Sequence, residues 1–221
     1  MIIIKNKSQL ISILKMHLPA KPCIVEAGAF IGKDTLLLST ALPDAQIHAF
    51  EPVPEIYCKL QEAIRHLAQV RTHPYALSAH SGTASFFVSE KPTRPGAICP
   101  AGSLLKPKDR LSWSPIIYPK EIGVTTITLD AWADQNNIDR IDFLWLDVQG
   151  IALPILQSSP RMISTLQVLW VEVEFIQAYE NQKSYKEMLD WLASNGFTLI
   201  AKDFETTDTW FFGNILCIKK N

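Results

Sequence analysis

The sequence of 221 residues has little of what marks a membrane protein or a nucleic-acid-binding protein. No apolar run approaches the length of about 20 residues that a membrane-spanning helix needs. The 21 Lys and Arg residues are balanced by 22 Asp and Glu residues, which gives a formal net charge of −1 at pH 7. A chain without a basic excess carries no general attraction to a phosphate backbone. We therefore expect neither a membrane nor a nucleic acid as its partner.

Cysteine is also scarce, and its spacing excludes the usual metal and disulfide patterns. None of the four cysteines stands in a Cys-x-x-Cys pair, and the five histidines show no ligand spacing. The segment Met1-Ile-Ile-Ile-Lys5 is too short for a signal peptide and has no small-residue cleavage site. We expect a cytoplasmic protein without a metal site.

The length suits one α/β domain, because 221 residues at 48% hydrophobic content support a single core. Residues 1–22 are expected to hold an amphipathic helix at 8–18, capped by Ser8, and a linker that contains two prolines. This helix is expected to cover one edge of a sheet. The domain proper is expected at 23–221, with a Pro-rich insertion at about 89–123.

The stretch Cys23-Ile-Val-Glu-Ala-Gly-Ala-Phe-Ile-Gly32 has the strongest local pattern. An apolar run that stops at Glu26 and passes into Gly28 and Gly32, before a helical pattern at 33–42, predicts a buried parallel strand, a tight turn and a helix. Glycines there let the backbone approach a ligand. The spacing lacks the third glycine of Gly-x-Gly-x-x-Gly, which disfavours a dinucleotide. A turn with no ligand is the plain alternative.

A second strand is predicted at 45–50, and it ends on Glu51 and Pro52. An acid at this place, some two dozen residues after the first strand, is positioned to accept both hydroxyls of a ribose. The alternative is an ordinary surface acid at a strand end. Because the glycine turn and the acid occur together, we favour ribose binding.

The remaining strands alternate with helices, which predicts a doubly wound, mostly parallel sheet. Core strands are expected at 141–146 and 166–173, and an antiparallel hairpin of 197–201 with 214–218 closes the sheet. Ligands of such sheets bind beyond the carboxyl ends of the strands. The polar residues expected at those ends are Glu26, Glu51, Ser78 and Asp147.

The segment from Glu90 to Gly123 has six prolines and no sustained period, so we expect it to be irregular. It is either a mobile lid over the ligand or a solvated loop. Its aromatic and basic residues suit an anionic or sugar-like substrate: Arg94, Lys106, Lys108, Arg110, Trp113 and Tyr118.

Taken in order, six motifs make the chain resemble the FkbM family of S-adenosylmethionine-dependent methyltransferases. They are Val25-Glu-Ala-Gly-Ala-Phe-Ile-Gly32, Phe50-Glu-Pro-Val-Pro54, Ala76-Leu-Ser78, Thr128-Leu-Asp130, Ile141-Asp-Phe-Leu-Trp-Leu-Asp-Val-Gln-Gly150 and Gly196-Phe197. The resemblance implies the class I methyltransferase fold, a Rossmann-like sheet of seven strands with an antiparallel last strand. It also implies methyl transfer to a hydroxyl oxygen of a small molecule, sugar or natural product. The implied cofactor-binding residues are Glu26, Gly28, Ala29, Phe30, Gly32, Glu51, Pro52, Ala76, Leu77, Ser78 and Asp147.

The motif after the fourth strand departs from the family pattern Lys-x-Asp-x-Glu-Gly-x-Glu. Trp145 stands at the Lys position, Gln149 at the first Glu and Ala152 at the second, whereas Asp147 and Gly150 are retained. These changes put the catalytic assignment in question more than the cofactor assignment.

A hydroxyl acceptor must lose its proton, so a carboxylate or histidine is expected at the pocket mouth. Asp147 is the first candidate base, Glu174 (or Glu172) the second and His80 the third. Asp147 alternatively caps a helix or holds the methionine amine, and the two glutamates alternatively form a solvated sheet end. Two other functions stay open: a binding module that has lost catalysis, and a nicotinamide-dependent oxidoreductase.

Overall fold

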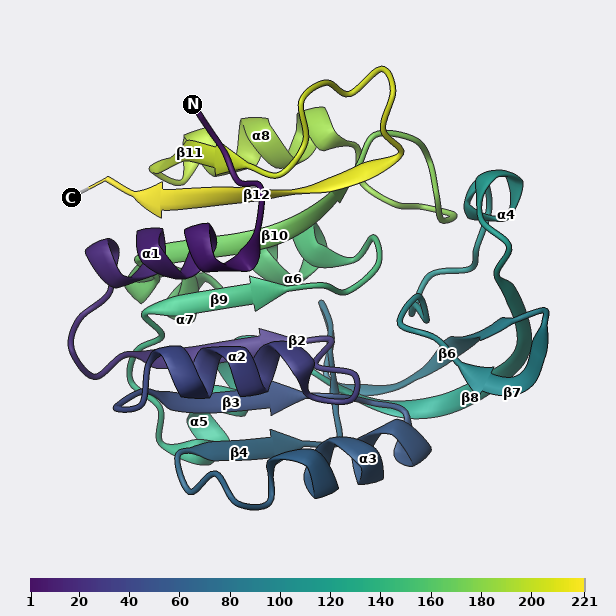
Figure 1. Cartoon of the computed structure of the whole chain (residues 1–221), viewed down its shortest axis with the longest axis horizontal. Helices are drawn as coiled ribbons and strands as arrows, with labels where there is room; N and C mark the ends of the chain where they lie inside the picture. Colours follow the sequence, from purple (N-terminus) through teal and green to yellow (C-terminus); the bar gives the residue numbers. More distant parts are fainter. Residues whose placement is uncertain (221) are drawn as a thin grey trace.

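A computed structural model describes residues 1–220, and its centre is an eight-stranded sheet in the order β1-β11-β12-β10-β9-β2-β3-β4 (Figure 1). β12 is antiparallel to both of its neighbours, and every other pair is parallel. The mostly parallel sheet and its closing hairpin are therefore confirmed. The count is eight rather than seven because Ile2 and Ile3 add a short edge strand. The strands are β1 (Ile2–Ile3), β2 (Cys23–Ala27), β3 (Gln46–Phe50), β4 (Val70–His73), β9 (Phe143–Leu146), β10 (Val168–Glu174), β11 (Phe197–Lys202) and β12 (Phe212–Lys219).

Helices cover both faces of this sheet, and each face has its own apolar core. One layer consists of α1 (Lys7–His17), α2 (Lys33–Ala41) and α3 (Pro54–Ile64), which lie in front of the sheet in Figure 1. The other consists of α5 (Leu129–Asn136), α6 (Ala152–Gln157), α7 (Pro160–Thr165) and α8 (Tyr185–Ser194). No helix within residues 1–220 is long and apolar enough to cross a membrane.

Two expectations for the N-terminal helix were wrong. α1 packs on a face of the sheet, where Leu10 and Leu14 join the core that contains Trp145 and Trp170. Its cap is Asn6, whose side chain accepts a hydrogen bond from the Gln9 N–H. Ser8 lies inside the helix.

The expectation of an irregular segment at 90–123 was also wrong. A second, four-stranded sheet in the order β5-β8-β6-β7 occupies much of it, with one short helix between β7 and β8. The elements are β5 (Ala76–Leu77), β6 (Gly82–Lys91), β7 (Arg94–Ile98), α4 (Arg110–Trp113) and β8 (Ile117–Ile127). Its prolines stand where a strand tolerates a missing N–H: Pro95 is on the edge strand β7, and Pro119 lies at the irregularity between the Val88 and Glu90 pairings of β6 with β8.

The register of the central strands places three loops side by side. Ala27 pairs with Phe50 on one side and with Leu146 on the other. The residues that follow these three positions are Gly28, Glu51 and Asp147, so they begin their loops at the same level of the sheet. The fold thereby brings together segments that are far apart in the chain.

Candidate functional site

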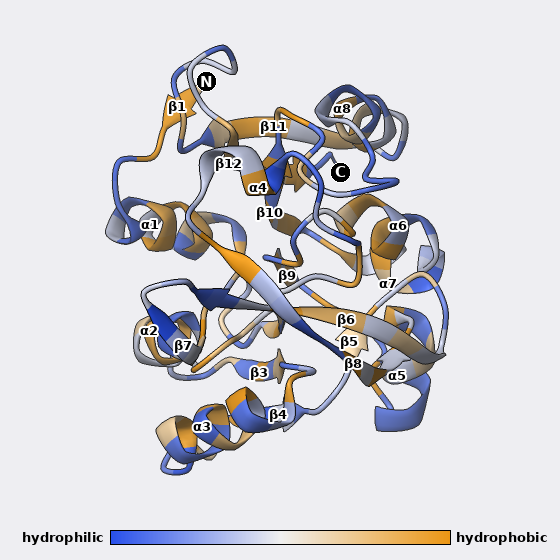
Figure 2. Ribbon diagram, turned by 90° about the vertical axis from the view of Figure 1, so that its right-hand side faces the viewer, coloured by the Kyte–Doolittle hydropathy of each residue, from blue (hydrophilic) through white to orange (hydrophobic). Residues whose placement is uncertain are grey.

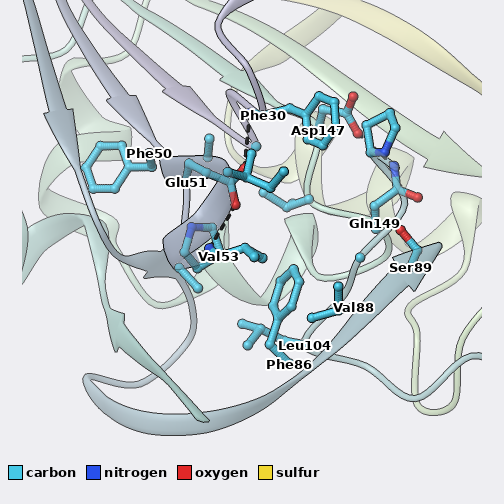
Figure 3. Close-up of a pocket in the computed structure, with 18 of the residues that line it drawn as sticks. Phe30, Phe50, Glu51, Val53, Phe86, Val88, Ser89, Leu104, Asp147 and Gln149 are labelled. Carbon is cyan, nitrogen blue, oxygen red and sulfur yellow. Dashed lines mark hydrogen bonds between the residues drawn. The ribbon is translucent and has the colours of Figure 1, made fainter. Parts of the chain in front are cut away.

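A cavity opens at the carboxyl ends of β2, β3 and β9 and is covered by the second sheet (Figure 3). Seven of the residues expected to bind cofactor line it: Gly28, Phe30, Glu51, Pro52, Ala76, Leu77 and Asp147. The cover, contributed by β6, β7 and the loop after β7, supplies Phe86, Val88, Ser89, Ile98, Cys99, Pro100, Gly102 and Leu104. The loops and the cover thus enclose a largely apolar space with a few polar groups, as small-molecule sites do.

Gly28 is required by the close packing of the first turn. Its φ is +86°, and a Cβ at this position would lie 1.9 Å from the Asp147 carbonyl oxygen. The N–H groups of Gly28 and Ala29 both donate to the Phe50 carbonyl, at 3.1 and 3.0 Å. The turn is therefore tied to the strands on either side of it.

Glu51 is buried at the cavity wall, with 5% of its surface exposed, so it is no ordinary surface acid. Its Oε1 accepts the Val53 N–H at 2.8 Å, and its Oε2 accepts the Phe30 N–H at 3.1 Å. Burial raises the pKa of this carboxyl to about 7, although both hydrogen bonds oppose the rise. Since a carboxylate oxygen has two lone pairs, each oxygen retains one for a further donor. The arrangement suits two neighbouring hydroxyls.

Four of the expected cofactor-binding residues are not brought to the cavity wall. Glu26 turns into the protein, where Thr35 Oγ1 donates to it at 2.6 Å and burial raises its pKa to about 8. Gly32 caps α2, and a Cβ there would meet Leu60 at 2.8 Å. The Ser78 N–H donates to the Ile127 carbonyl, and Ala29 is buried in the core next to α1. These residues shape the turn and the second sheet.

Gln149 links the polar groups at one end of the cavity. Its φ is +51°, and its side chain is nearly buried. Nε2 donates to Asp147 Oδ1 at 2.7 Å and to Glu172 Oε2 at 2.6 Å, while Oε1 accepts the Tyr179 hydroxyl at 2.8 Å. An amide donates two hydrogen bonds to two acids, which a glutamate at this position cannot do when ionised.

The two glutamates of β10 do not form a solvated sheet end, which corrects that alternative. Glu174 is 8% exposed, and Glu172 bonds to Gln149 inside the protein. The chain that follows β10 folds over this end of the sheet and is held there by the insertion. The Lys108 N–H donates to the Ala178 carbonyl at 2.8 Å, and the Glu180 N–H donates to the Lys106 carbonyl at 2.8 Å.

Burial is the largest cause of the pKa shifts of the Asp147, Glu172 and Glu174 carboxyls. It raises the pKa of Asp147, and it raises the pKa of Glu172 well above its usual range, with the neighbouring Asp147 charge adding to the effect. Burial also raises the pKa of Glu174 to about 8. Two close acids do not both ionise easily, so the charge of Asp147 opposes the ionisation of Glu172.

The candidate bases are placed differently from one another. Asp147 lines the cavity, whereas Glu174 lies to one side of it beside Glu172, and His80 is exposed on a bend. Sequence reasoning noted Gln149 only as a departure and did not find Tyr179. Both act through contacts with residues distant in the chain, for which no local signal exists. Among residues 1–220, no cluster of His, Cys, Asp and Glu is arranged to hold a metal ion.

Comparison with known proteins agrees with this geometry. The methyltransferase FkbM domain matches residues 26–199. The 2-O-methyltransferase NoeI of Sinorhizobium fredii is 27% identical over 200 residues, which are 90% of this chain and 80% of NoeI. The methyltransferase sdnD of Sordaria araneosa is 28% identical over 171 residues, which are 64% of this chain and 61% of sdnD.

Solved structures share the fold at low identity. The methyltransferase FkbM from Methylobacillus flagellatus superposes with a TM-score of 0.56 and 14% identity, over 90% of this chain and 44% of that one. The magnesium protoporphyrin IX methyltransferase of Synechocystis, solved with bound S-adenosylmethionine, gives a TM-score of 0.54 and 13% identity, over 96% of this chain and 77% of that one. The class I methyltransferase fold expected from the sequence is confirmed.

Proposed function

The chain belongs to the FkbM family of methyltransferases, and from this premise we propose that it methylates a hydroxyl oxygen of a small molecule or glycan with S-adenosylmethionine as donor. The observation that carries the proposal is the buried Glu51 carboxylate, which is held by two backbone N–H groups and keeps two lone pairs for a ribose. The similar protein NoeI, a 2-O-methyltransferase, supports an oxygen acceptor.

The residues at the cavity fit this cofactor. Gly28 presents backbone without a side chain, and Ala76 and Leu77 offer an apolar wall next to Glu51. When bound, S-adenosylmethionine supplies an electrophilic methyl group on its sulfonium. The protein's own contribution is to orient the acceptor and to remove its proton.

The proton of the acceptor hydroxyl passes to the group of acids at the cavity end. Asp147 lines the cavity beside Gln149, and Glu51, the other acid in the cavity wall, is assigned to the ribose. Gln149 donates a hydrogen bond to both Asp147 and Glu172, and its bond to Asp147 lowers the pKa of that carboxyl against the larger effect of burial, which favours the ionised form that a base needs. Glu174 is the second candidate base because its pKa of about 8 lies close to neutrality.

We expect the cover to open when a ligand of this size binds. The free volume of the cavity is about 70 Å³, whereas pockets for drug-sized ligands hold about 300–1,000 Å³. Phe86 and Leu104 reach into the cavity from the cover in Figure 3. The expectation that the insertion acts as a lid stays a prediction, and the small cavity supports it.

A second function, a binding module without catalysis, is favoured by one observation. Gln149 takes the place of a family glutamate and cannot itself accept a proton as a base. Cofactor binding without turnover on any hydroxylated acceptor would support this function. Because the chain belongs to a methyltransferase family, a nicotinamide-dependent oxidoreductase is no longer favoured. A cytoplasmic location and the lack of nucleic-acid or membrane partners stay predictions.

Calorimetric titration with S-adenosylhomocysteine, with NADH as the control ligand, tests the proposal. We expect binding of S-adenosylhomocysteine in the micromolar range, about −8 kcal/mol, and none of NADH. Absence of binding by S-adenosylhomocysteine, or equal binding by both ligands, would contradict it.

A further inference from the structure

Unpaired polar atoms gather at one place outside the cofactor cavity. Residues 1–220 contain seven buried side-chain nitrogen and oxygen atoms without a hydrogen-bond partner. Four of them belong to three neighbouring residues: Nε and Nη1 of Arg110, Nε1 of Trp113 and Oε1 of Glu174. The Arg110 guanidinium lies 4.0 Å over the Trp113 ring and 5.7 Å over the Phe212 ring, and Phe212 is paired with Glu174 across β12 and β10.

Leaving Nε and Nη1 of the Arg110 guanidinium without hydrogen-bond partners is costly unless something else bonds to them. Arg110 is 9% exposed, and a buried polar group normally has its hydrogen bonds made. Its charge lowers the pKa of Glu172 and Glu174 against the larger effect of burial, so it lies close to both. No side-chain hydrogen bond of Arg110 is formed to them. Nε and Nη1 of Arg110 are therefore free to donate hydrogen bonds to a ligand, and Oε1 of Glu174 is free to accept one.

Aromatic rings stand beside these atoms. Trp113 stacks on Phe211 with ring centres 4.7 Å apart and an interplanar angle of 7°. Trp210, Phe211 and Phe212 are 47%, 45% and 38% exposed, which is unusual for large apolar side chains so close together. Figure 2 shows α4, which carries Arg110 and Trp113, lying beside β12. The rings offer a flat apolar surface at the edge of the buried polar groups.

This place is connected to the reactive end of the cofactor cavity. The Arg110 N–H donates to the Ala178 carbonyl at 3.1 Å. The next residue, Tyr179, donates its hydroxyl to Gln149, which in turn bonds to Asp147 at the cavity. The segment that carries Arg110 is thus held against Ala178 and Tyr179, and Tyr179 contacts the group of side chains that contains the candidate base.

We propose that Arg110, Glu174 and the stacked rings of Trp113 and Phe211 form the acceptor site, and that its ligand is a neutral ring with adjacent hydroxyls, such as a sugar residue. This inference rests on the proposed function. A hydroxyl both donates and accepts, so it matches guanidinium donors beside an unpaired carboxyl oxygen. The Arg110 charge already acts on the carboxyls of Glu172 and Glu174, which disfavours a further anionic group as its ligand. The stacked rings of Trp113 and Phe211 contact the apolar C–H face of the sugar.

The test uses the full chain saturated with S-adenosylhomocysteine on an array of neutral and acidic glycans. We expect retention on neutral glycans. Arg110→Gln and Phe211→Ala should each weaken it roughly tenfold or more, as expected when a hydrogen bond to a charged group or an aromatic contact is lost. The matched control Arg65→Gln, at the exposed arginine that directly follows α3, should leave retention unchanged. All three variants should bind S-adenosylhomocysteine like the parent chain.

Several outcomes would overturn the inference while the proposed function stands. They are intact S-adenosylhomocysteine binding with no neutral glycan retained, retention of acidic glycans only, or Arg110→Gln retaining glycans as well as the parent chain. Co-sedimentation with phosphatidylcholine vesicles in place of glycan binding would instead assign the exposed rings to a lipid surface. Loss of S-adenosylhomocysteine binding by the parent chain would contradict the proposed function itself.

Discussion

The cofactor cavity and the Arg110 region lie at the same end of the sheet, but they are built in opposite ways. In the first, Glu51 has a backbone N–H on each carboxylate oxygen, and Gly28 packs against Asp147 without room for a methyl group. In the second, buried polar atoms of Arg110, Trp113 and Glu174 are left without hydrogen-bond partners. The cofactor half is thus organised before its ligand arrives, whereas the acceptor half carries an energetic cost that a ligand relieves. Substitutions in the two halves should therefore differ in sign as well as in size.

The largest effect is expected at Gly28. Gly28→Ala places a Cβ 1.9 Å from a backbone oxygen at a φ of +86°. Strain of about 1–2 kcal/mol from the left-handed conformation and about 1–3 kcal/mol from overpacking should lower the free energy of unfolding. Urea denaturation measures this, with Gly96→Ala as the control, because Gly96 has a similar φ and open space around it. Equal losses in both variants would mean that close packing at Gly28 is unimportant.

The next effect concerns the ribose contact. Glu51→Ala should weaken S-adenosylhomocysteine binding by about 1–3 kcal/mol because a buried hydrogen-bond partner is removed. Calorimetry measures the change, and Glu55→Ala, at an exposed acid on α3, is the control. Unchanged affinity in Glu51→Ala would refute the assignment of Glu51 to the ribose.

Cofactor affinity should also depend on pH. Burial raises the pKa of Glu51 to about 7, and only the ionised carboxylate accepts from both hydroxyls. Binding therefore favours the deprotonated form, so affinity falls as the pH falls below 7, by up to about tenfold per pH unit, and levels off above 8. Titrations from pH 5.5 to 8.5 measure this. Glu51→Gln should flatten the profile, and a parent profile that is already flat would contradict the prediction.

In the acceptor half a substitution should stabilise the ligand-free protein, whereas Gly28→Ala in the cofactor half destabilises it. Arg110→Met removes two buried nitrogen atoms that have no hydrogen-bond partner and keeps a long side chain over Trp113. We expect the free energy of unfolding of the ligand-free protein to rise by about 1 kcal/mol, since well-packed apolar side chains often stabilise such sites. Urea denaturation compares it with Arg65→Met. A loss of stability greater than in that control would mean that Arg110 serves the fold rather than a ligand.

The smallest effect should be local opening of the cover. Residues 90–122 should exchange their amide hydrogens and be cut by protease faster without ligand than with S-adenosylhomocysteine, because the closed cavity is only about 70 Å³. Hydrogen exchange read by mass spectrometry measures this, with α5 as the internal reference. Full protection of the ligand-free protein would argue against a lid.

The sequence alone was sufficient for most of the cofactor half. The apolar run before Gly28, the acid at the end of the next strand and the alternation of strands with helices are local patterns, since each depends on residues close together in the chain. They predicted the doubly wound sheet, its closing antiparallel hairpin and the place of Glu51 and Asp147 at the sheet edge. The family and its class I fold were implied by the resemblance of six motifs.

The tertiary structure decided the rest, because it depends on contacts between distant residues. β6 and β8 satisfy each other's backbone groups, which turned a Pro-rich segment with no period into a sheet. The burial of Glu172 and Glu174 depends on the chain after β10, which the insertion holds over them. Gln149 contacts Glu172 and Tyr179, which are distant from it in the sequence. The sequence places Glu26 among the ligand-binding acids, but in the structure its carboxylate accepts a hydrogen bond from Thr35. Burial and hydrogen-bond partners set the charge of these groups, and neither can be predicted from the spacing of residues in the sequence.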